Sequence, residues 1–268
     1  MSAAYEAFAA LHERGTFVLA NAWDAASAVV LADAGFKALG TSSAAIAHAL
    51  GRADGLHAVG RDEAIANGAL LARASGLPVN GDLEDGFGAS PEDCVATVEA
   101  AIAGGLAGLG IEDTTADPAR PIHDFDAAVA RITAAAKAAR GRIVLTARTD
   151  IYLHGQGDLA EAIRRLTAFS EAGADVLYAP ALPDIAAIRA VVAAVAPKPV
   201  NVLLGPWGAF GSIDALAEAG VRRVSLGVAL HSSTLSHLAR VAARVAAGDL
   251  AAAVEGNAAL GLDARFAS

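Results

Sequence analysis

The sequence predicts an α/β protein that folds as a single (β/α)8 TIM barrel with additional C-terminal helices. Short strand-like runs alternate with helical stretches along the chain, and eight such runs can be counted. The length of 268 residues is close to the ~250 residues that one such barrel uses. No linker-like segment interrupts the series. We therefore expect residues 1–268 to form one domain, with residues 248–268 as a C-terminal helical extension.

The predicted strands are short, mostly apolar runs that are bounded by turn residues. They cover residues 17–20, 38–41, 79–82, 108–111, 143–147, 176–179, 200–203 and 223–226. Strict alternation of strands with helices implies a parallel sheet. An open doubly wound sheet more often has about five to seven strands and a switch point. Eight uninterrupted units therefore favour a closed barrel.

The predicted helices begin at capping residues and end at glycines. Candidate starts, whose side chains can accept free backbone N–H groups, are Asp24, Ser90, Asp124, Asp158, Asp184 and Ser212. Glycines that suit a left-handed helix end are Gly35, Gly76, Gly104, Gly173 and Gly220. An Ala-Gly pair followed by an apolar residue recurs before new strands. Each helix is thus predicted to end directly before a strand.

Charge and cysteine content narrow the classes of function. The net charge of −9 disfavours nucleic acid and anionic membranes as partners, because both need a basic surface. An anionic small substrate stays compatible, since a metal ion and one arginine can reverse the local charge in a cleft. The single cysteine, Cys94, excludes an intramolecular disulfide and a cysteine-rich metal site. With neither a signal peptide nor a long apolar span in the sequence, we expect a cytoplasmic protein.

Three acidic residues stand at the predicted strand ends, where the loops of a barrel line its working face. Asp82 and Glu84 are two apart on a segment expected to be extended, so both side chains can point into the mouth. Glu112 follows the next strand. Carboxylates without cysteine or histidine describe a hard oxygen site, which suits Mg²⁺ or Mn²⁺ rather than Zn²⁺. The alternative is that these acids are solvated and cap the following helices.

Three other features allow two interpretations each. Arg148 at the end of the fifth strand can pair with Glu112 structurally, or can present its fork to a substrate carboxylate. The glycine-rich residues 205–211 follow the seventh strand, where many barrels bind phosphate, but the glycines can equally shape a turn. Cys94 lies in a predicted helix, and we expect a buried core residue there rather than a nucleophile.

At these positions the chain resembles the isocitrate lyase and phosphoenolpyruvate mutase superfamily over nearly its whole length. Residues 21–25 (NAWDA) resemble the family's opening, and residues 41–45 (TSSAA) resemble its serine-glycine turn. Residues 82–88 (DLEDGFG) are similar to its metal-binding stretch, and residues 111–113 (IED) and 147–150 (ARTD) follow in register. The resemblance implies that Mg²⁺ is bound, partly through water, by Asp82, Glu84 and Glu112, with Asp54 as an additional site acid.

The resemblance also implies how a substrate is held. Arg148 and the turn at Ser42 and Ser43 would bind the carboxylate and carbonyl of a 2-oxo acid, and Asn201 would line the pocket. The chemistry shared in the family is the formation or trapping of a pyruvate-like enolate, whose charge a metal ion and an arginine can stabilise. Members are commonly tetramers that exchange a C-terminal helix, so we expect a homo-oligomer, either a tetramer or a dimer.

Residues 114–123 (TTADPARPIH) depart from the family's pattern. The lyases carry a Lys-Arg/Lys-Cys-Gly-His loop here with the cysteine as acid or base, and Pro121 stands where that cysteine would be. The Lys and Asn of the phosphonate mutases are also missing, and Glu84 replaces the more usual aspartate. We expect this loop to close over the substrate and to bring Arg120 near its developing charge.

We therefore predict a Mg²⁺-dependent lyase that cleaves a carbon–carbon bond of a small 2-oxo or 2-hydroxy carboxylate through a pyruvate-like enolate. Its catalytic residues would be Arg148, Glu112, Asp54 and Arg120. One alternative is a carbon–phosphorus bond enzyme, a phosphonomutase or phosphonopyruvate hydrolase. The other is a non-catalytic barrel that retains the metal and oxo-acid pocket.

Overall fold

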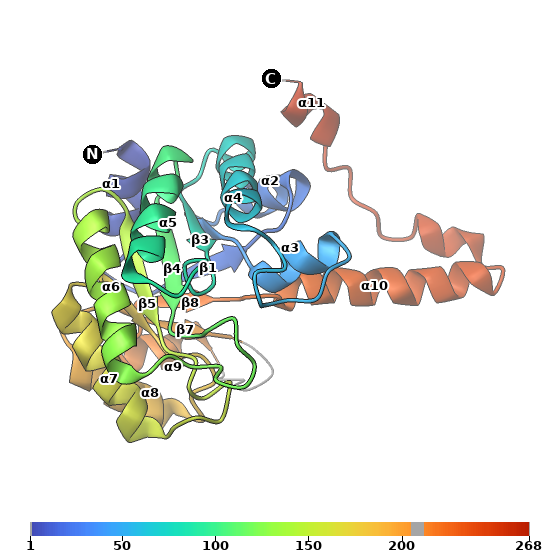
Figure 1. Cartoon of the computed structure of the whole chain (residues 1–268). Helices are drawn as coiled ribbons and strands as arrows, with labels where there is room; N and C mark the ends of the chain where they lie inside the picture. Colours follow the sequence, from blue (N-terminus) through green and yellow to red (C-terminus); the bar gives the residue numbers. More distant parts are fainter. Residues whose placement is uncertain (1, 205–211, 268) are drawn as a thin grey trace.

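The protein is a closed parallel barrel of eight strands in sequence order, with β8 paired to β1 (Figure 1). The computed structural model describes residues 2–204 and 212–267. The strands are β1 Phe17–Asn21, β2 Leu39–Gly40, β3 Val79–Asp82, β4 Gly108–Glu112, β5 Val144–Arg148, β6 Val176–Tyr178, β7 Val200–Leu203 and β8 Arg223–Ser225. All eight overlap the predicted runs, so the prediction of a (β/α)8 barrel is confirmed.

Helices cover the outside of the barrel and connect its strands (Figure 1). They are α1 Ala3–Ala10, α2 Ala25–Asp33, α3 Ser43–Ala49, α4 Arg61–Ser75, α5 Pro91–Ala103, α6 Phe125–Ala139, α7 Leu159–Ala172, α8 Ile185–Val195 and α9 Ile213–Glu218. The capping prediction is confirmed at five of its six positions, where the N-cap side chain accepts a backbone N–H. Asp124 precedes α6 but makes no such bond. At the end of α5 the left-handed residue is Gly105 rather than the predicted Gly104.

The inside of the barrel is filled by side chains at the end where the strands begin and is open at the other end. Phe8 of α1 closes the end at which the strands begin, where it packs with Leu19, Val144 and Val176. Gly110 faces the interior from β4, and a Cβ added there would lie 3.8 Å from its nearest neighbour, the backbone oxygen of Gly81. Because no side chain fills that space, the interior stays open toward the ends of the strands.

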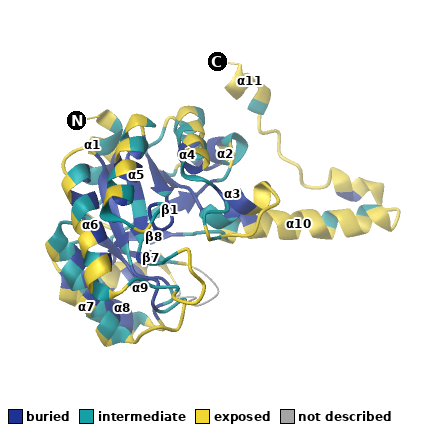
Figure 2. Ribbon diagram, viewed as in Figure 1, coloured by how far each residue is buried: buried dark blue, intermediate teal, exposed yellow. Residues whose placement is uncertain are grey.

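A C-terminal arm leaves the barrel after β8. It consists of α10 Ala229–Ala246, η1 Leu250–Ala253 and α11 Leu262–Phe266, and Figure 1 shows α10 running away from the barrel. Figure 2 shows that most of the arm is exposed, and His231 is the buried residue of α10. The chain then returns to α2, where Arg265 pairs with Asp33 at 3.0 Å. The arm therefore does not cap the barrel mouth.

Two further sequence expectations concern the glycine-rich segment after β7 and membrane-spanning helices. The glycine-rich residues 205–211, predicted as a turn or phosphate loop, lie outside the described residues. Among the helices of residues 2–204 and 212–267, none combines the length and the apolar character needed to cross a membrane.

Candidate active site

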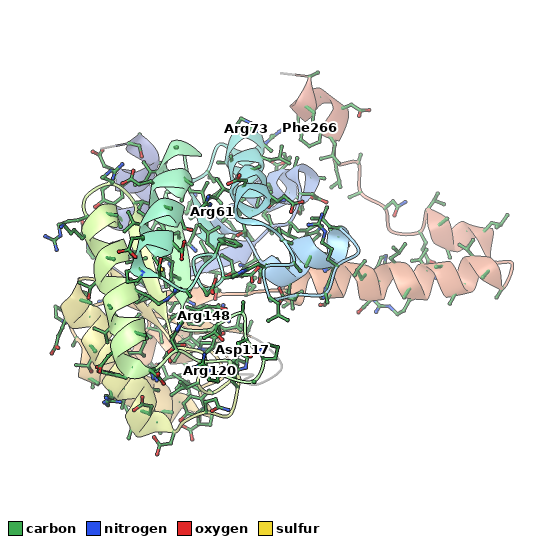
Figure 3. All side chains as sticks on the ribbon, viewed as in Figure 1. Arg61, Arg73, Asp117, Arg120, Arg148 and Phe266 are labelled. Atoms are coloured by element: carbon green, nitrogen blue, oxygen red, sulfur yellow. The ribbon has the colours of Figure 1, made fainter. Side chains whose placement is uncertain are left out.

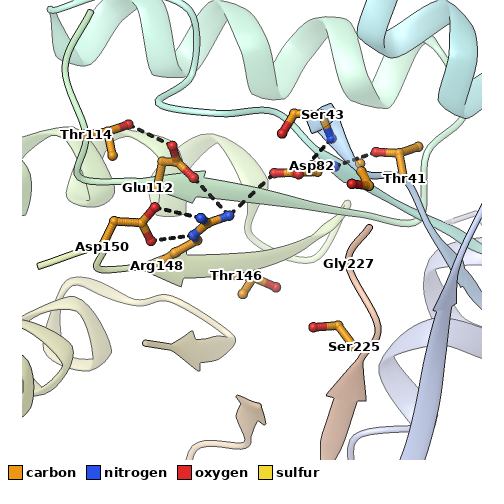
Figure 4. A network of polar contacts seen from close by, with 12 residues as sticks. Thr41, Ser43, Asp82, Glu112, Thr114, Thr146, Arg148, Asp150, Ser225 and Gly227 are labelled. Atoms are coloured by element: carbon orange, nitrogen blue, oxygen red, sulfur yellow. Dashed lines mark hydrogen bonds and ion pairs between the residues drawn. The ribbon is translucent and has the colours of Figure 1, made fainter. Parts of the chain in front are cut away.

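A cavity of ≈ 210 Å³ opens at the carboxyl ends of the strands. Its lining includes the predicted residues Ser42, Ser43, Asp54, Asp82, Glu112, Arg148 and Asn201. Two predicted residues, Glu84 and Arg120, are not among the described residues that line it. Figure 4 shows the polar contacts that join the strand ends. The barrel thus brings together side chains from β3, β4, β5 and β7 that are far apart in the sequence.

Arg148 is the centre of this network. Its Nε and Nη2 bind the two carboxylate oxygens of Asp150 at 2.5 and 2.6 Å. Its Nη1 lies 3.0 Å from Glu112 Oε2 and 3.8 Å from Asp82 Oδ1. The guanidinium also stands over the Tyr178 ring, 5.3 Å from its centroid. The fork of Arg148 is therefore engaged by Asp150, and Nη1 faces the acids of the cavity.

Asp82 is fixed by the turn that follows β2. Its backbone N–H donates to Thr41 Oγ1 at 2.7 Å, and its Oδ2 accepts the backbone N–H of Ser43 at 3.0 Å (Figure 4). Ser42 caps α3 by accepting the N–H of Ala45 at 3.4 Å. The same short turn thus starts α3 and orients the Asp82 carboxylate toward the cavity.

Negative charge exceeds positive charge at the mouth. Burial and the charge of Asp82 raise the pKa of Asp54, whose carboxylate is hydrogen-bonded to the Ser43 side chain. Burial also raises the pKa of Glu112 well above its usual range, even though Arg148 opposes this shift. Glu112 Oε1 accepts a hydrogen bond from Thr114 Oγ1 at 2.8 Å. The acids destabilise one another's charged forms, and Arg148 alone does not compensate for this.

Glu84 does not lie where an extended segment would place it. Its φ of 46° is left-handed, so the extended backbone ends at Asp82 and the two side chains do not point the same way. Glu84 Oε2 instead accepts the backbone N–H of His57 at 3.2 Å. Burial, together with the charge of Asp82, raises the pKa of Glu84 to about 7. The turn geometry that follows β3 could not be deduced from residue spacing.

The donor set at the mouth fits a hard divalent cation by its chemistry. Asp54, Asp82, Glu84 and Glu112 offer only oxygen atoms, and each of the three raised pKa values reflects charge that a cation would balance. Among the described residues, however, no group of three acidic, histidine or cysteine side chains is arranged to hold one ion directly. Asp82 and Glu112 are the acids of the set that also contact Arg148. The geometry therefore does not favour direct binding of one cation by all three predicted ligands, Asp82, Glu84 and Glu112. Ligation partly through water fits the geometry better.

A chain of contacts behind the cavity positions Arg148. Arg165 of α7 binds Asp113 Oδ2 at 2.9 Å, and Asp113 Oδ1 accepts the backbone N–H of Asp150 at 2.8 Å. Thr149 Oγ1 donates to the same Asp113 carboxylate at 2.6 Å. Asp150 in turn holds Arg148. Asp113 and Asp150 therefore link the ends of β4 and β5 without forming part of the predicted metal set.

The loop after β4 stands apart from the cavity. Thr114 and Ile122 form an antiparallel bridge, so residues 114–122 make a small hairpin. The Arg120 side chain is 82% exposed and lies 3.6 Å from Asp117 Oδ2. Figure 3 shows both residues on this loop, with Arg148 farther back toward the barrel. The predicted role of Arg120 thus requires the loop to move.

Sequence reasoning gave no role to three residues of the cavity region. Asp150 belongs to the ARTD motif, and its position two residues after Arg148 was the available signal. Tyr178 ends β6 and faces Arg148. Arg223 lies inside β8, where a charged residue in a predicted strand was the signal.

Cys94 is buried on α5, as predicted, and burial raises its pKa to about 11.

The chain is similar in sequence and fold to known proteins. A solved structure from Burkholderia cenocepacia, provisionally assigned as a lyase or mutase, is 43% identical, with a TM-score of 0.92 and coverage of 98% of this chain and 95% of that one. The 2-methylisocitrate lyase of Escherichia coli is 32% identical over 68% of this chain and 63% of its own length. A structure of oxaloacetate acetylhydrolase with its product oxalate is 26% identical, with a TM-score of 0.83 and coverage of 92% and 88%.

Residues 8–246 match the family described as phosphoenolpyruvate phosphomutase. This match extends from α1 through α10 and includes every strand of the barrel and every residue of the mouth. The named relatives include a lyase and an acetylhydrolase, so the chain is related to enzymes. The chain therefore belongs to the phosphoenolpyruvate phosphomutase family, as the motifs at its strand ends indicate.

Proposed function

We propose that this protein is a Mg²⁺-dependent lyase that cleaves a carbon–carbon bond of a small 2-oxo or 2-hydroxy carboxylate and leaves a pyruvate-like enolate. The observation that carries the proposal is the placement of Asp82 and Glu112 on either side of Arg148 Nη1 in one cavity. Relatives named as 2-methylisocitrate lyase and oxaloacetate acetylhydrolase support this substrate class. The cavity volume of ≈ 210 Å³ suits a molecule of that size.

Each residue at the mouth has a task in this proposal. Asp82, Glu84 and Glu112 would hold the cation, in part through water, and the cation would supply stabilisation of negative charge on a substrate oxygen. Arg148 stabilises the same developing charge, because its position is fixed before the reaction by Asp150. Asp54 has a raised pKa and lines the cavity, so it can hold a proton there.

The substrate side of the mouth is formed by the turn at residues 42–44. The backbone N–H of Ser43 already donates to Asp82, and Ser42 and Ser43 both line the cavity. Their hydroxyl groups can bind the carboxylate and carbonyl of a 2-oxo acid next to Arg148. Asn201 lines the wall deeper in the barrel, where its amide binds Arg223 and Ser225.

A carbon–phosphorus bond enzyme is the second candidate, because the matching family is named for a phosphomutase. The loop at residues 114–123 contains neither the lyase cysteine nor the mutase Lys and Asn, so it supports neither branch. A third candidate is a barrel that binds a metal ion and an oxo acid without turnover. Arg148, Asp82 and Glu112 are all retained at the mouth, which favours the lyase over a barrel that only binds its ligand.

A substrate panel tests the proposal. Oxaloacetate, alkylmalates, methylisocitrate and phosphonopyruvate are each incubated with the protein and Mg²⁺ while pyruvate and phosphoenolpyruvate are measured. We expect pyruvate-forming cleavage, or cleavage to an equivalent 2-oxo product, for one of the carbon substrates. Turnover of phosphonopyruvate alone would support the second candidate. The absence of turnover for every compound, with oxalate still bound, would support the third.

We further propose that the loop at residues 114–123 closes over the substrate. Thr114 connects the loop to the site through its bond to Glu112, and Pro118 and Pro121 limit the loop to few conformers. Oxalate with Mg²⁺ should then protect the loop from proteolysis. Arg120→Ala should lower turnover about 10-fold while changing oxalate affinity less, as expected for a contact made chiefly in the transition state. Arg142→Ala, which removes an exposed arginine paired with Glu99, serves as the control.

The arm supports a homo-oligomer, a tetramer or a dimer. Leu235, Leu238, Leu250 and Val254 are exposed on the arm, with exposed fractions of 47% to 72%, and apolar surface of this kind commonly marks an interface. Leu238→Glu should shift the sedimentation coefficient toward that of a monomer. If the wild-type protein already sediments as a monomer, this assignment is wrong.

A further inference from the structure

Arg223 of β8 is a buried cation at the floor of the cavity. Its exposed fraction is 2%, and it lines the same cavity as Asp82 and Arg148. Nε donates to Asn201 Oδ1 at 2.8 Å, and Nη2 donates to Thr146 Oγ1 at 2.9 Å. A guanidinium has five N–H donors, so part of its hydrogen-bonding capacity is still unused.

The third hydrogen-bonding partner of Arg223, His12, is neutral. His12 Nδ1 lies 2.9 Å from the carbonyl oxygen of Phe8, which can only accept, so Nδ1 carries the hydrogen. His12 Nε2 is then an acceptor, and it faces Arg223 Nη1 at 3.4 Å. Burial and the charge of Arg223 lower the pKa of His12 to about 3. His12 therefore stays uncharged at neutral pH and adds no compensating charge.

No carboxylate within the described ranges 2–204 and 212–267 forms an ion pair with Arg223. Burial lowers its pKa to about 10, which leaves the guanidinium positively charged at neutral pH. Arg165 is buried to a similar extent, but it binds both Asp113 and Glu161. A buried charge without a partner is costly for a fold. An anionic ligand at the floor would remove that cost.

The cavity wall near Arg223 keeps other unused hydrogen-bonding capacity. Asn80 of β3 lines the cavity with an exposed fraction of 8%, and its Oδ1 has no partner among the described residues. The side-chain amide of Asn80 can flip, so either its oxygen or its nitrogen can face a ligand. Figure 4 shows Thr146 and Ser225 on the side of the cavity away from the joined acids. The floor is thus polar and free of carboxylates among the described residues that line it.

The two arginines of the cavity are linked by the strand register. Arg148 pairs with Tyr178, Tyr178 with Asn201, and Asn201 with Arg223. Neighbouring strands are about 4.8 Å apart, so one row of paired residues joins the two across three strand steps. Both side chains line the enclosed space. One small molecule can therefore contact both ends if it carries two anionic groups.

We propose that Arg223 forms a second anion-binding position at the cavity floor and takes a terminal carboxylate of a dicarboxylate substrate. This proposal rests on the proposed function for the other end of the substrate, which the mouth binds at Arg148 and the metal acids. Arg223 is then a specificity residue, because it distinguishes a dianionic molecule from a monoanionic one of the same length.

Matched inert ligands test this assignment without turnover. Malonate and succinate are compared with propionate and butyrate, which have the same carbon chains but one carboxylate fewer. Calorimetry on the full-length protein with Mg²⁺ gives each Kd. We expect the dicarboxylate of at least one pair to bind about 30-fold more tightly than its partner. Arg223→Met should abolish that preference and change monocarboxylate affinity less than about 3-fold.

Arg223→Lys keeps the charge with fewer hydrogen bonds and should retain most of the preference. It also provides a second variant if Arg223→Met does not fold, as judged by circular dichroism. Equal weakening of both members of a pair in Arg223→Met would assign Arg223 a purely structural role and overturn the proposal. The absence of any preference in the wild-type protein would also overturn it.

The same measurements distinguish a carboxylate site at Arg223 from a phosphonate site, and they are independent of the test for lyase activity. 3-Phosphonopropionate replaces one carboxylate of succinate by a phosphonate, and tighter, Arg223-dependent binding of it would overturn the carboxylate assignment in favour of a phosphonate. Failure of the whole substrate panel would reject the proposed lyase. An Arg223-dependent preference for dicarboxylates would nevertheless support the floor position in that case, because binding and turnover are measured independently.

Discussion

Two arginines, the half-buried Arg148 and the buried Arg223, face one cavity from opposite surroundings. Arg148 at the mouth lies within 4 Å of three carboxylates, those of Asp82, Glu112 and Asp150. Arg223 at the floor binds neutral groups, and no described acid pairs with it. The mouth therefore has an excess of negative charge and the floor has an excess of positive charge.

This difference indicates how the cavity orients a ligand. A divalent cation would balance the acids at the mouth, and a carboxylate would balance Arg223 at the floor. A substrate that brings its reacting oxygen to the cation and a terminal carboxylate to the floor satisfies both ends. A substrate bound in the opposite orientation would place its terminal carboxylate beside the uncompensated acids of the mouth. Substitutions at the mouth are expected to have the largest effects.

Neutralising Asp82 should have the largest effect. Asp82→Asn should lower turnover at least ~1000-fold, about 4 kcal/mol of transition-state stabilisation, because a cation ligand is lost. EDTA should have the same effect on the wild-type protein, with Mg²⁺ or Mn²⁺ restoring activity and Zn²⁺ doing so poorly. Binding of Mn²⁺, followed by electron paramagnetic resonance, should weaken in parallel.

The matched control for this prediction is Asp62→Asn, which removes an acid whose side chain is 93% exposed. It should leave turnover and Mn²⁺ binding unchanged. Full activity of Asp82→Asn without added metal would show that the acids at the mouth do not hold a cation. The proposed difference between a cation-binding mouth and an anion-binding floor would then be wrong.

Arg148→Ala should have the next largest effect. Oxalate resembles a planar enolate, and we expect its binding to weaken by about 2 kcal/mol, or roughly 30-fold, because a carboxylate would remain unpaired in a partly desolvated site. Titration calorimetry with Mg²⁺ measures the change. Arg164→Ala, an exposed arginine that pairs with Glu161, is the control. Unchanged oxalate affinity in Arg148→Ala would show that its contacts with the acids are purely structural.

The mouth could be predicted from the sequence to a larger extent than the floor. The acids and Arg148 follow predicted strands directly, and parallel strand ends must meet at one face of a barrel. Arg223 contacts Thr146 and His12, which are 77 and 211 residues away in the sequence. These contacts form only when β8 closes against β1, and no local pattern encodes them. The left-handed turn at Glu84 was missed because spacing does not determine φ.

Two titratable groups beside the cavity, Glu84 and His12, should make the stability depend on pH with opposite sign. The pKa of Glu84 is raised to about 7, so the metal-free folded state binds an extra proton between about pH 4.5 and 7. The difference in unfolding free energy between wild type and Glu84→Gln should therefore fall as pH rises through this window. We expect a change on the order of 2 kcal/mol, allowing for the remaining solvent contact. Urea unfolding at a series of pH values measures it.

His12 provides the opposite case at the floor. Its pKa is lowered to about 3, so the unfolded state binds the extra proton between about pH 3 and 6.5. The difference in unfolding free energy between wild type and His12→Gln should rise as pH rises through that window. Parallel slopes for the two variants would contradict the burial of both groups in the folded protein, which is the largest cause of each shift.

The smallest effect is expected for a buried ionisable group outside the cavity. Cys94 is fully buried on α5, with Sγ 3.8 Å from the carbonyl oxygen of Asp85, and it is not among the lining residues described. Its pKa of about 11 leaves a very small thiolate fraction at neutral pH. Cys94→Ser should thus keep turnover within about 3-fold, while the buried hydroxyl lowers the unfolding free energy by about 1 kcal/mol. Cys94→Ala, which adds no hydroxyl, separates the packing cost from the polar cost. A loss of turnover beyond about 100-fold in both folded variants, about 2.7 kcal/mol, would require a cysteine in the reaction. That result would shift the chemistry away from the mouth acids.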